Sequence, residues 1–449
     1  MTSDATYEAA LDLTREWCKI PSVKGDDRQI ARQADALATW LKNELGATIV
    51  SASSANGRPP VIHARIDVGA EKTVILYNMY DVMPASPEGW SVDPFKGGIV
   101  DLEGIGESFV ARGAENNKGP LAGMLFAVKA LADAGKLRVN VEILVDGEEE
   151  SGSGAMRDYL AALDCPVRNS VSALFPSFCE YGGGAPRVYL GFSGIAKGEV
   201  RVDAGAWGGP KAAIHSSNAP WIGNPASRLV EALSLIGKPP TGELARTAID
   251  AEAASIISEL AKTFDPAAEL RFRKTETFSL GGNAQALLEH VLSTASFNIS
   301  SLESMPLGSD GVIPHAARAA FELRTPPSLN PADFLKQYRM TLETAPGAIL
   351  NVADSYPGFR FSADAPGVLA LIKSYKTTAN APPQIWPWAI GAAPAYAFAR
   401  HASSFLLAGA GRGGNAHGID EFMTTEGFRR FIQSITLWLE HVADETEAA

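Results

Sequence analysis

Val141-Glu-Ile-Leu-Val-Asp-Gly-Glu-Glu-Glu-Ser-Gly-Ser-Gly154 decides the fold, because an apolar run leads three consecutive carboxylates onto a glycine-rich turn. Adjacent carboxylates such as Glu148, Glu149 and Glu150 raise one another's pKa, so the group is costly unless it binds a cation or transfers protons. A solvated acidic turn is the alternative interpretation. The preceding run is typical of a buried α/β strand, and ligand crevices form at the carboxyl ends of such strands. The pattern therefore favours a functional site at this turn.

Composition predicts a soluble protein of more than one domain. With 449 residues, of which 46% are hydrophobic and 20% charged, the chain exceeds the usual size of a single compact unit. The net charge of -12 argues against a nucleic-acid or membrane partner. The few, irregularly spaced cysteines and the polar N-terminus predict a cytoplasmic protein without a signal peptide. No apolar run reaches membrane-spanning length.

Before the acidic turn, helical and strand-like patterns alternate as in an α/β sheet. Asp81 follows one apolar strand, and Asn116 or Asn117 is suited to cap the next helix. The first helix is expected to end before Pro21, because the residue preceding proline disfavours helix. The segments in order are helices over Thr6–Lys19 and Gln29–Leu45, strands over Val61–Val68 and Thr73–Tyr80, and a helix over Leu121–Ala134.

A second pattern begins near Lys197, where strands and helices occur in α+β proportions. Helical segments then return near the C-terminus. We therefore predict that residues 1–196 and 356–449 form one α/β domain, interrupted by a smaller domain over 197–355. The expected elements after Lys197 are strands over Gly198–Val202, Ala295–Ile299, Arg318–Arg324 and Ile349–Asp354, and helices over Ser227–Ile236, Asn330–Thr344, Gly367–Thr377 and Phe428–Val442.

Several short motifs, taken in their order and spacing, resemble one family across nearly the whole chain. That family is the dinuclear-zinc exopeptidases and amidohydrolases, which include aminoacylases, succinyl-diaminopimelate desuccinylase, glutamate carboxypeptidases and carnosinase-like dipeptidases. The resemblance implies a zinc-peptidase-like mixed-sheet catalytic domain interrupted by a lid domain, which commonly forms a homodimer. The motifs are Ile20-Pro-Ser-Val23, Tyr80-Asp-Val-Met-Pro84, Arg112-Gly-Ala114 with Lys118-Gly119, Gly147-Glu-Glu-Glu-Ser-Gly-Ser153, His215-Ser216, and His417 with Glu421.

The resemblance also implies roles for individual residues. Glu149 corresponds to the general base that takes a proton from the attacking water. Glu150 and His417 correspond to ligands of one metal ion, and Asp81 to the carboxylate that orients a ligand histidine. His215 resembles the lid histidine that polarises the scissile carbonyl and often reaches into the partner subunit's site.

Three positions depart from the family's metal ligands. Met79 stands at the position of the histidine expected before Asp81, and Asn116 stands at the position of the bridging aspartate. Ser177 stands at the position of the next acidic ligand, unless Cys179 or Glu180 has taken the place of that ligand. Asparagine cannot bridge two cations as a carboxylate does, and a thioether is a poor zinc ligand. We therefore expect zinc or another divalent cation at no more than one site per chain, held by Glu150, His417 and Asn116, or no metal at all.

The lid supplies the predicted substrate contacts. Asn298 and Arg324 fall where the family places groups that hold substrate oxygens. Trp388 stands where many members have an arginine that grips a substrate carboxylate. This change favours a neutral or aromatic substrate at that end, although Trp386 and Trp388 are equally compatible with a hydrophobic core.

These features predict a hydrolase of an amide-type C–N bond in a small molecule, with Glu149 as base and a degenerate metal site. This hypothesis is favoured by the presence together of Glu149, Glu150, Asp81, His215 and His417. One alternative is an inactive homologue that acts as a ligand-binding or partner subunit. Another is a different carbonyl reaction in the same pocket, such as isomerisation with Glu149 as base.

Overall fold

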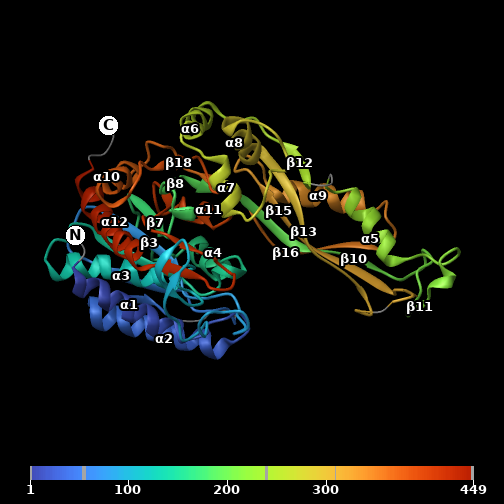
Figure 1. Ribbon diagram of the computed structural model, residues 1–449, viewed down its shortest axis with the longest axis horizontal. Coiled ribbons are helices and arrows are strands. Elements are labelled where there is room, and N and C mark those ends of the chain that lie inside the picture. Colours follow the sequence, from blue (N-terminus) through green and yellow to red (C-terminus); the bar gives the residue numbers. More distant parts are fainter. Residues whose placement is uncertain (1–2, 53–56, 238–240, 309, 446–449) are drawn as a thin grey trace.

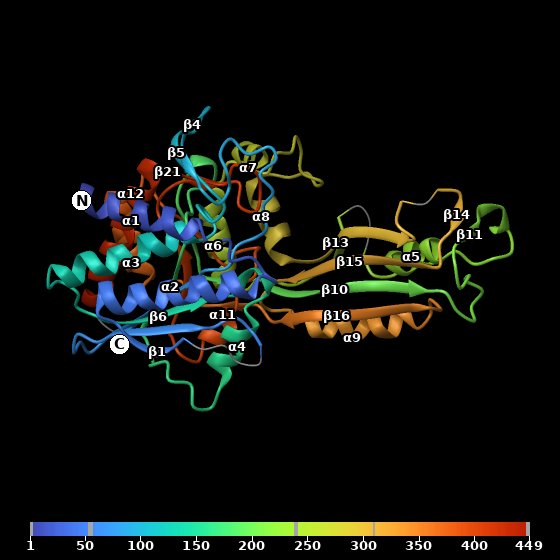
Figure 2. The same cartoon turned by 90° about the horizontal axis from the view of Figure 1, so that it is seen from below.

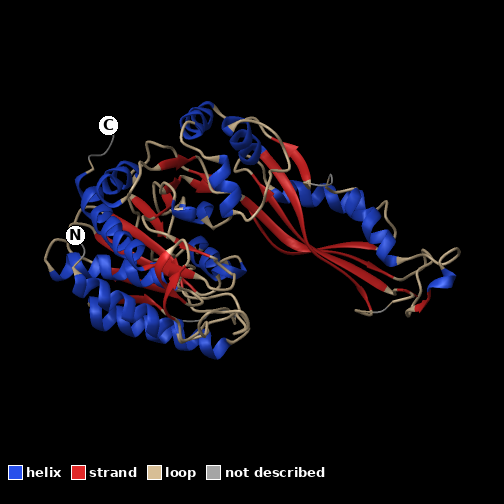
Figure 3. Cartoon of the chain, in the orientation of Figure 1, coloured by secondary structure: helices blue, strands red, loops and turns tan. Residues whose placement is uncertain are grey.

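The computed structural model describes residues 3–52, 57–237, 241–308 and 310–445. It shows a large α/β domain from which an elongated arm extends to one side (Figure 1). Coloured by secondary structure, the arm is a long sheet with helices along one side, whereas helices surround the sheet of the α/β domain (Figure 3). No helix in these ranges combines the length and apolarity that a membrane span requires.

The α/β domain is built on a mixed sheet of eight strands, in the order β1-β2-β6-β3-β7-β19-β8-β18. The central strands β3 and β6 run parallel, and every residue in them is buried, as expected for strands covered on both faces. The predicted fold class, a mixed α/β sheet domain, is confirmed. The strands are β1 (Thr48–Ser51), β2 (Ile62–Ile66), β3 (Thr73–Met79), β6 (Asn140–Asp146), β7 (Ser172–Pro176), β8 (Arg187–Tyr189), β18 (Gln384–Trp386) and β19 (Phe405–Ala408).

Helices from both ends of the chain cover one face of this sheet and share one hydrophobic core with it. Trp438 is fully buried in that core, and its indole N–H donates to the carbonyl oxygen of Gly367 over 3.1 Å. The C-terminal segment therefore completes the domain that the N-terminal segment begins. The helices are α1 (Asp4–Cys18), α2 (Asp27–Leu45), α3 (Lys118–Asp133), α10 (Val368–Thr378) and α12 (Thr425–Asp444), while the short α4 (Gly154–Ala161) and α11 (Ala395–Phe398) contribute to the core on the other face.

A small four-stranded sheet, absent from the sequence-based prediction, lies at the edge of this domain. Its order is β20-β21-β5-β4, so it joins the segment before α3 to the segment before α12. The strands are short, which is why no alternating pattern indicated them. They are β4 (Gly98–Leu102), β5 (Gly106–Val110), β20 (Gly413–Gly414) and β21 (Phe422–Thr424).

The arm is an antiparallel sheet of order β12-β13-β15-β10-β16. Helices α5 (Pro225–Ser234) and α9 (Pro331–Leu342) cover one face and form a separate hydrophobic core with it. At the far tip, β11 (Ile214–His215) pairs with β14 (Val312–Ile313) (Figure 2). The five strands are β10 (Gly194–Asp203), β12 (Glu243–Arg246), β13 (Thr294–Met305), β15 (Ala316–Thr325) and β16 (Ala348–Tyr356). β9 (Gly191–Phe192) and β17 (Phe359–Arg360) pair where the chain enters and leaves the arm.

Three helices within the inserted segment were not predicted. α6 (Ala251–Ala261), α7 (Pro266–Phe272) and α8 (Ala284–Ser293) lie at the base of the arm. Ile257 and Leu288 are buried in the same core as Phe405 of the central sheet. This part of the insertion therefore packs on the α/β domain, and the division at 197 and 355 stays a prediction.

We predict that Trp438→Ala lowers the free energy of unfolding by about 3–5 kcal/mol, the usual result of emptying a large buried site. Leu369 in α10 is 60% exposed, so Leu369→Ala is a suitable control and should change stability by less than about 0.5 kcal/mol. Urea unfolding followed by circular dichroism measures both. Equal effects would contradict the interleaving of the N- and C-terminal segments in one core.

Candidate active site

Asp81 holds the acidic turn in place. It follows β3, the parallel neighbour of β6, so the ends of the two strands lie side by side. Its buried carboxylate accepts the backbone N–H groups of Glu149 and Glu150, each over 3.1 Å. Asp81 therefore contacts the backbone of this turn. The family resemblance had instead implied that Asp81 orients a histidine, whose position is occupied by Met79.

The three glutamates of the turn point in different directions. The carboxylate of Glu148 accepts from the backbone N–H of Ala155 at the start of α4 and lies 3.6 Å from Arg58. Glu149 is partly buried, and burial raises the pKa of its carboxyl group well above the usual range, reinforced by Glu150 and other acids nearby. Glu149 is consequently a stronger base than an exposed glutamate.

Glu150, His417 and Asn116 form a triangle of polar contacts, in which Nε2 of His417 either donates to Glu150 or accepts from Asn116. Nδ2 of Asn116 lies 2.8 Å from Oε1 of Glu150 and 3.0 Å from Nε2 of His417, and Nε2 of His417 lies 3.1 Å from Glu150. The hydrogen bond to Glu150 raises the pKa of His417. His417 also has a φ of 64°, a conformation that a non-glycine residue adopts at some energetic cost and that is frequent at functional sites.

A buried carboxylate positions this triangle. Glu421 is fully buried and accepts backbone N–H groups from Gly113, Glu115 and Asn116 over 2.8–3.1 Å. It also forms a 2.5 Å ion pair with Arg112, whose guanidinium donates to the carbonyl oxygen of His417. Glu421 and Arg112 thus connect the loop of Asn116 to the loop of His417.

The donor groups do not fit a two-zinc centre. Within the described ranges, histidine, cysteine, aspartate and glutamate form no group of three or more that could hold a metal ion. Glu150 and His417 offer two donors, whereas protein zinc sites use three or four, and the amide of Asn116 lies against both. Glu180 pairs with Arg430 at 2.5 Å, and Cys179 is buried with a raised pKa, so neither compensates for Ser177 or Met79.

The base of the arm presents polar groups to the acidic turn. Pairing across the sheet aligns Asn298, Glu322 and Lys197 on one face, opposite the face covered by α5 and α9. Burial raises the pKa of Glu149, and the charge of Lys197 opposes this effect. No pattern in the sequence marks Lys197, because one lysine in an alternating strand is indistinguishable from a solvated surface residue.

Arg324 and Trp388 line one cavity of about 380 Å³ at the junction of arm and α/β domain. Trp388 is also buried in the hydrophobic core together with Trp386, so it contributes both to packing and to a cavity wall. Asn298 is exposed on β13 and stands across from Glu322.

His215 lies far from the other predicted site residues of its own chain. It is exposed in β11, and its ring accepts a hydrogen bond from the backbone of Ser217. β11 stands at the tip of the arm, at the opposite end of the molecule from the α/β domain (Figure 2). His215 therefore does not join Glu149 within one chain.

A family model, Peptidase family M20/M25/M40, matches residues 75–441. The chain belongs to this family. The predicted family and the peptidase- or amidohydrolase-type class agree with that match. The Cys-Gly metallodipeptidase dug1 of Schizosaccharomyces pombe is 28% identical over 60% of this chain and 57% of its own length. The human Beta-Ala-His dipeptidase is 37% identical over 34% of this chain and 33% of its own length. The aligned region thus spans little more than half of the length of the first relative and about a third of the length of the second.

Solved structures show the same fold over nearly the whole chain. The M20 family metallo-carboxypeptidase Sso-CP2 from Sulfolobus solfataricus has a TM-score of 0.83 at 25% identity, covering 97% of this chain and 99% of its own. Human carnosine dipeptidase 1 has a TM-score of 0.80 at 20% identity, covering 98% of this chain and 97% of its own. The fold of this family is therefore present over nearly the whole chain.

We predict that the purified chain holds less than about one zinc ion, because the donor set falls short of the three or four ligands that zinc requires. The triple variant Met79→His, Asn116→Asp, Ser177→Asp restores the family's ligand types and should take up more zinc. Elemental analysis after dialysis against zinc measures both. Two zinc ions in the unaltered protein would contradict the prediction.

Proposed function

We propose that this chain hydrolyses an amide-type C–N bond in a small molecule, with Glu149 as the general base. The observation that carries the proposal is the setting of Glu149, which is partly buried among acids and held by Asp81. The names of its relatives, dipeptidases and a carboxypeptidase, support a peptide-like substrate.

In the proposed reaction, Glu149 takes a proton from water as the water attacks the substrate carbonyl. The oxyanion that forms needs hydrogen-bond donors, and Lys197 and Arg324 present cationic groups from the base of the arm. Glu149 then returns its proton to the leaving nitrogen, and the C–N bond breaks. No step passes through a metal ion.

In this proposal, the triangle of Asn116, Glu150 and His417 takes over part of the electrostatic task of a metal. The hydrogen bond between His417 and Glu150 favours the protonated, cationic form of His417. That charge would offset the carboxylate of Glu150 beside the base. The triangle also fixes the loop that follows β20.

The second candidate is an inactive homologue whose cleft binds a ligand or whose chain supports an active partner. The substituted ligand positions Met79, Asn116 and Ser177 favour it. A hydrolysis screen of dipeptides and N-acyl amino acids separates the two candidates. Turnover above that of the Glu149→Gln variant supports the hydrolase.

We predict that Glu149→Gln lowers turnover by about 10²–10⁴-fold with little effect on folding, because the amide keeps the shape but accepts no proton. Glu148→Gln is the matched control, since Glu148 belongs to the same turn but bonds to the start of α4. It should retain activity within about tenfold of the unaltered protein. Equal losses in the two variants would refute the role of Glu149.

We further propose a homodimer in which the arm of one copy brings His215 to the site of the other, because His215 is remote from its own Glu149. Mixing and refolding His215→Ala with Glu149→Gln should then restore about a quarter of the original activity, since half the dimers hold one intact site. Light scattering checks the oligomeric state. A monomer, or a mixture that stays inactive, would contradict this arrangement.

A further inference from the structure

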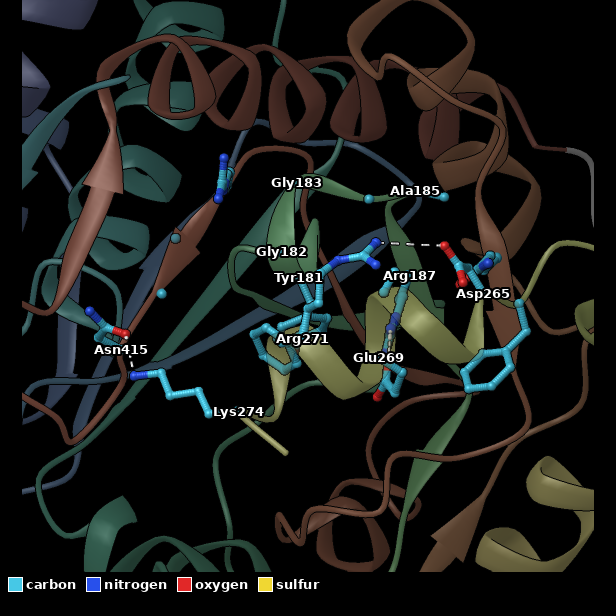
Figure 4. A pocket seen from close by; sticks show the side chains of 18 of the residues that line it. Tyr181, Gly182, Gly183, Ala185, Arg187, Asp265, Glu269, Arg271, Lys274 and Asn415 are labelled. Carbon is cyan, nitrogen blue, oxygen red and sulfur yellow. Dashed lines mark hydrogen bonds and ion pairs between the residues drawn. The ribbon is translucent and has the colours of Figure 1, made fainter. Parts of the chain in front are cut away.

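A second cavity, of about 870 Å³, lies apart from Glu149 and Asp81. Its walls come from α7, from the glycine-rich turn over residues 181–184, and from the loop over 412–416 (Figure 4). Figure 4 shows Lys274 beside Asn415, and Arg187 beside Glu269, around this space. None of these residues takes part in the proposed hydrolysis.

Arg412 carries a charge that nothing in the described chain balances. Its guanidinium makes no ion pair and donates no hydrogen bond to any described residue, and its Nε is fully buried. Burial lowers the pKa of Arg412, and no nearby acid counteracts this effect. Arg412 is half-buried, and a partly desolvated charge without a protein partner is unfavourable, so this guanidinium is available to pair with a bound anion.

The glycine-rich turn over residues 181–184 packs against the side chain of Arg412. A Cβ atom at Gly183 would lie 3.4 Å from Nη1 of Arg412, so the turn runs in direct contact with the guanidinium. Gly183 has a φ of 79°, which glycine adopts readily and which a larger residue would adopt only with strain. A side chain at this position would also occupy space next to Arg412.

The remaining charges of the cavity are also mainly positive. Nζ of Lys274 contacts the side-chain oxygen of Asn415 at 3.3 Å and pairs with no carboxylate among the described residues. The 3.9 Å contact of Arg271 with Asp265 is exposed and weak. Only Arg187 has a close buried partner, Glu269 at 2.5 Å. The cavity thus has an excess of positive charge in a chain whose net charge is -12.

We propose that this cavity binds a small organic anion, in which a phosphate or carboxylate group pairs with Arg412 and Lys274 and an apolar body occupies the rest. Arginine binds both oxyanions in a two-pronged geometry, which favours it at such sites. Phe264, Phe272 and Phe422 supply apolar wall for the body of the ligand. Its wall includes Asn415 and Ala416, which precede His417 in the chain, but none of the residues given a role in the proposed hydrolysis.

The test measures binding rather than activity. Isothermal titration calorimetry with phenyl phosphate and with phenylacetate, at low ionic strength, should show saturable binding of at least one, and the comparison identifies the preferred oxyanion. Benzyl alcohol, which has the ring but no charge, should bind far more weakly. Arg412→Gln should weaken binding by about tenfold or more, as expected for loss of a charge-assisted hydrogen bond.

Two controls separate this role from a structural one. Arg318 is an arginine on the arm that pairs with Glu303, so Arg318→Gln should leave anion binding unchanged. Because Arg412 lacks a protein partner, Arg412→Gln should unfold at the same temperature as the unaltered protein, or higher, when no anion is present. Binding of neither anion, or equal binding by the Arg412→Gln variant, would overturn the proposal.

Discussion

The hydrogen bonds of Asp81 to the acidic turn are the interaction on which the site depends. Three acidic residues at the end of one strand repel one another, so this turn needs a fixed partner to keep one conformation. Asp81 provides it by accepting two backbone N–H groups, although a buried carboxylate beside other carboxylates is itself unfavourable. The parallel pairing of β3 with β6 brings Asp81 to that place. The sheet topology therefore positions both the turn and the group that holds it.

A second buried carboxylate connects the other half of the site. Glu421 gathers three backbone N–H groups and the guanidinium of Arg112, so it is satisfied even though it is fully removed from water. The loop of Asn116 and the loop of His417 are held together as a result. Where relatives are named metallodipeptidases, this chain places an asparagine amide between a glutamate and a histidine. In this chain the scaffold of the family therefore carries a cluster of amide, carboxylate and imidazole groups.

The sequence predicted most of the α/β domain, because long apolar strands and amphipathic helices carry strong periodic signals. It did not predict the small sheet around β20 and β21 or the helices α6 to α8, whose short or alanine-rich segments give weak patterns. Motifs marked Glu149 and His417 as candidate site residues from the chain alone. No pattern in the sequence marks Lys197 or Arg412, because the case for each depends on contacts distant in sequence or on the lack of a partner among the described residues.

The central claim is that Glu149 acts as a base in a site that does not depend on zinc. The most direct measurement is the rate of amide hydrolysis by protein that has been depleted of metal with a chelator and checked by elemental analysis. Our account predicts that the depleted protein keeps its turnover and that Glu149→Gln abolishes it. Loss of turnover on depletion, with recovery on adding zinc back, would contradict the account.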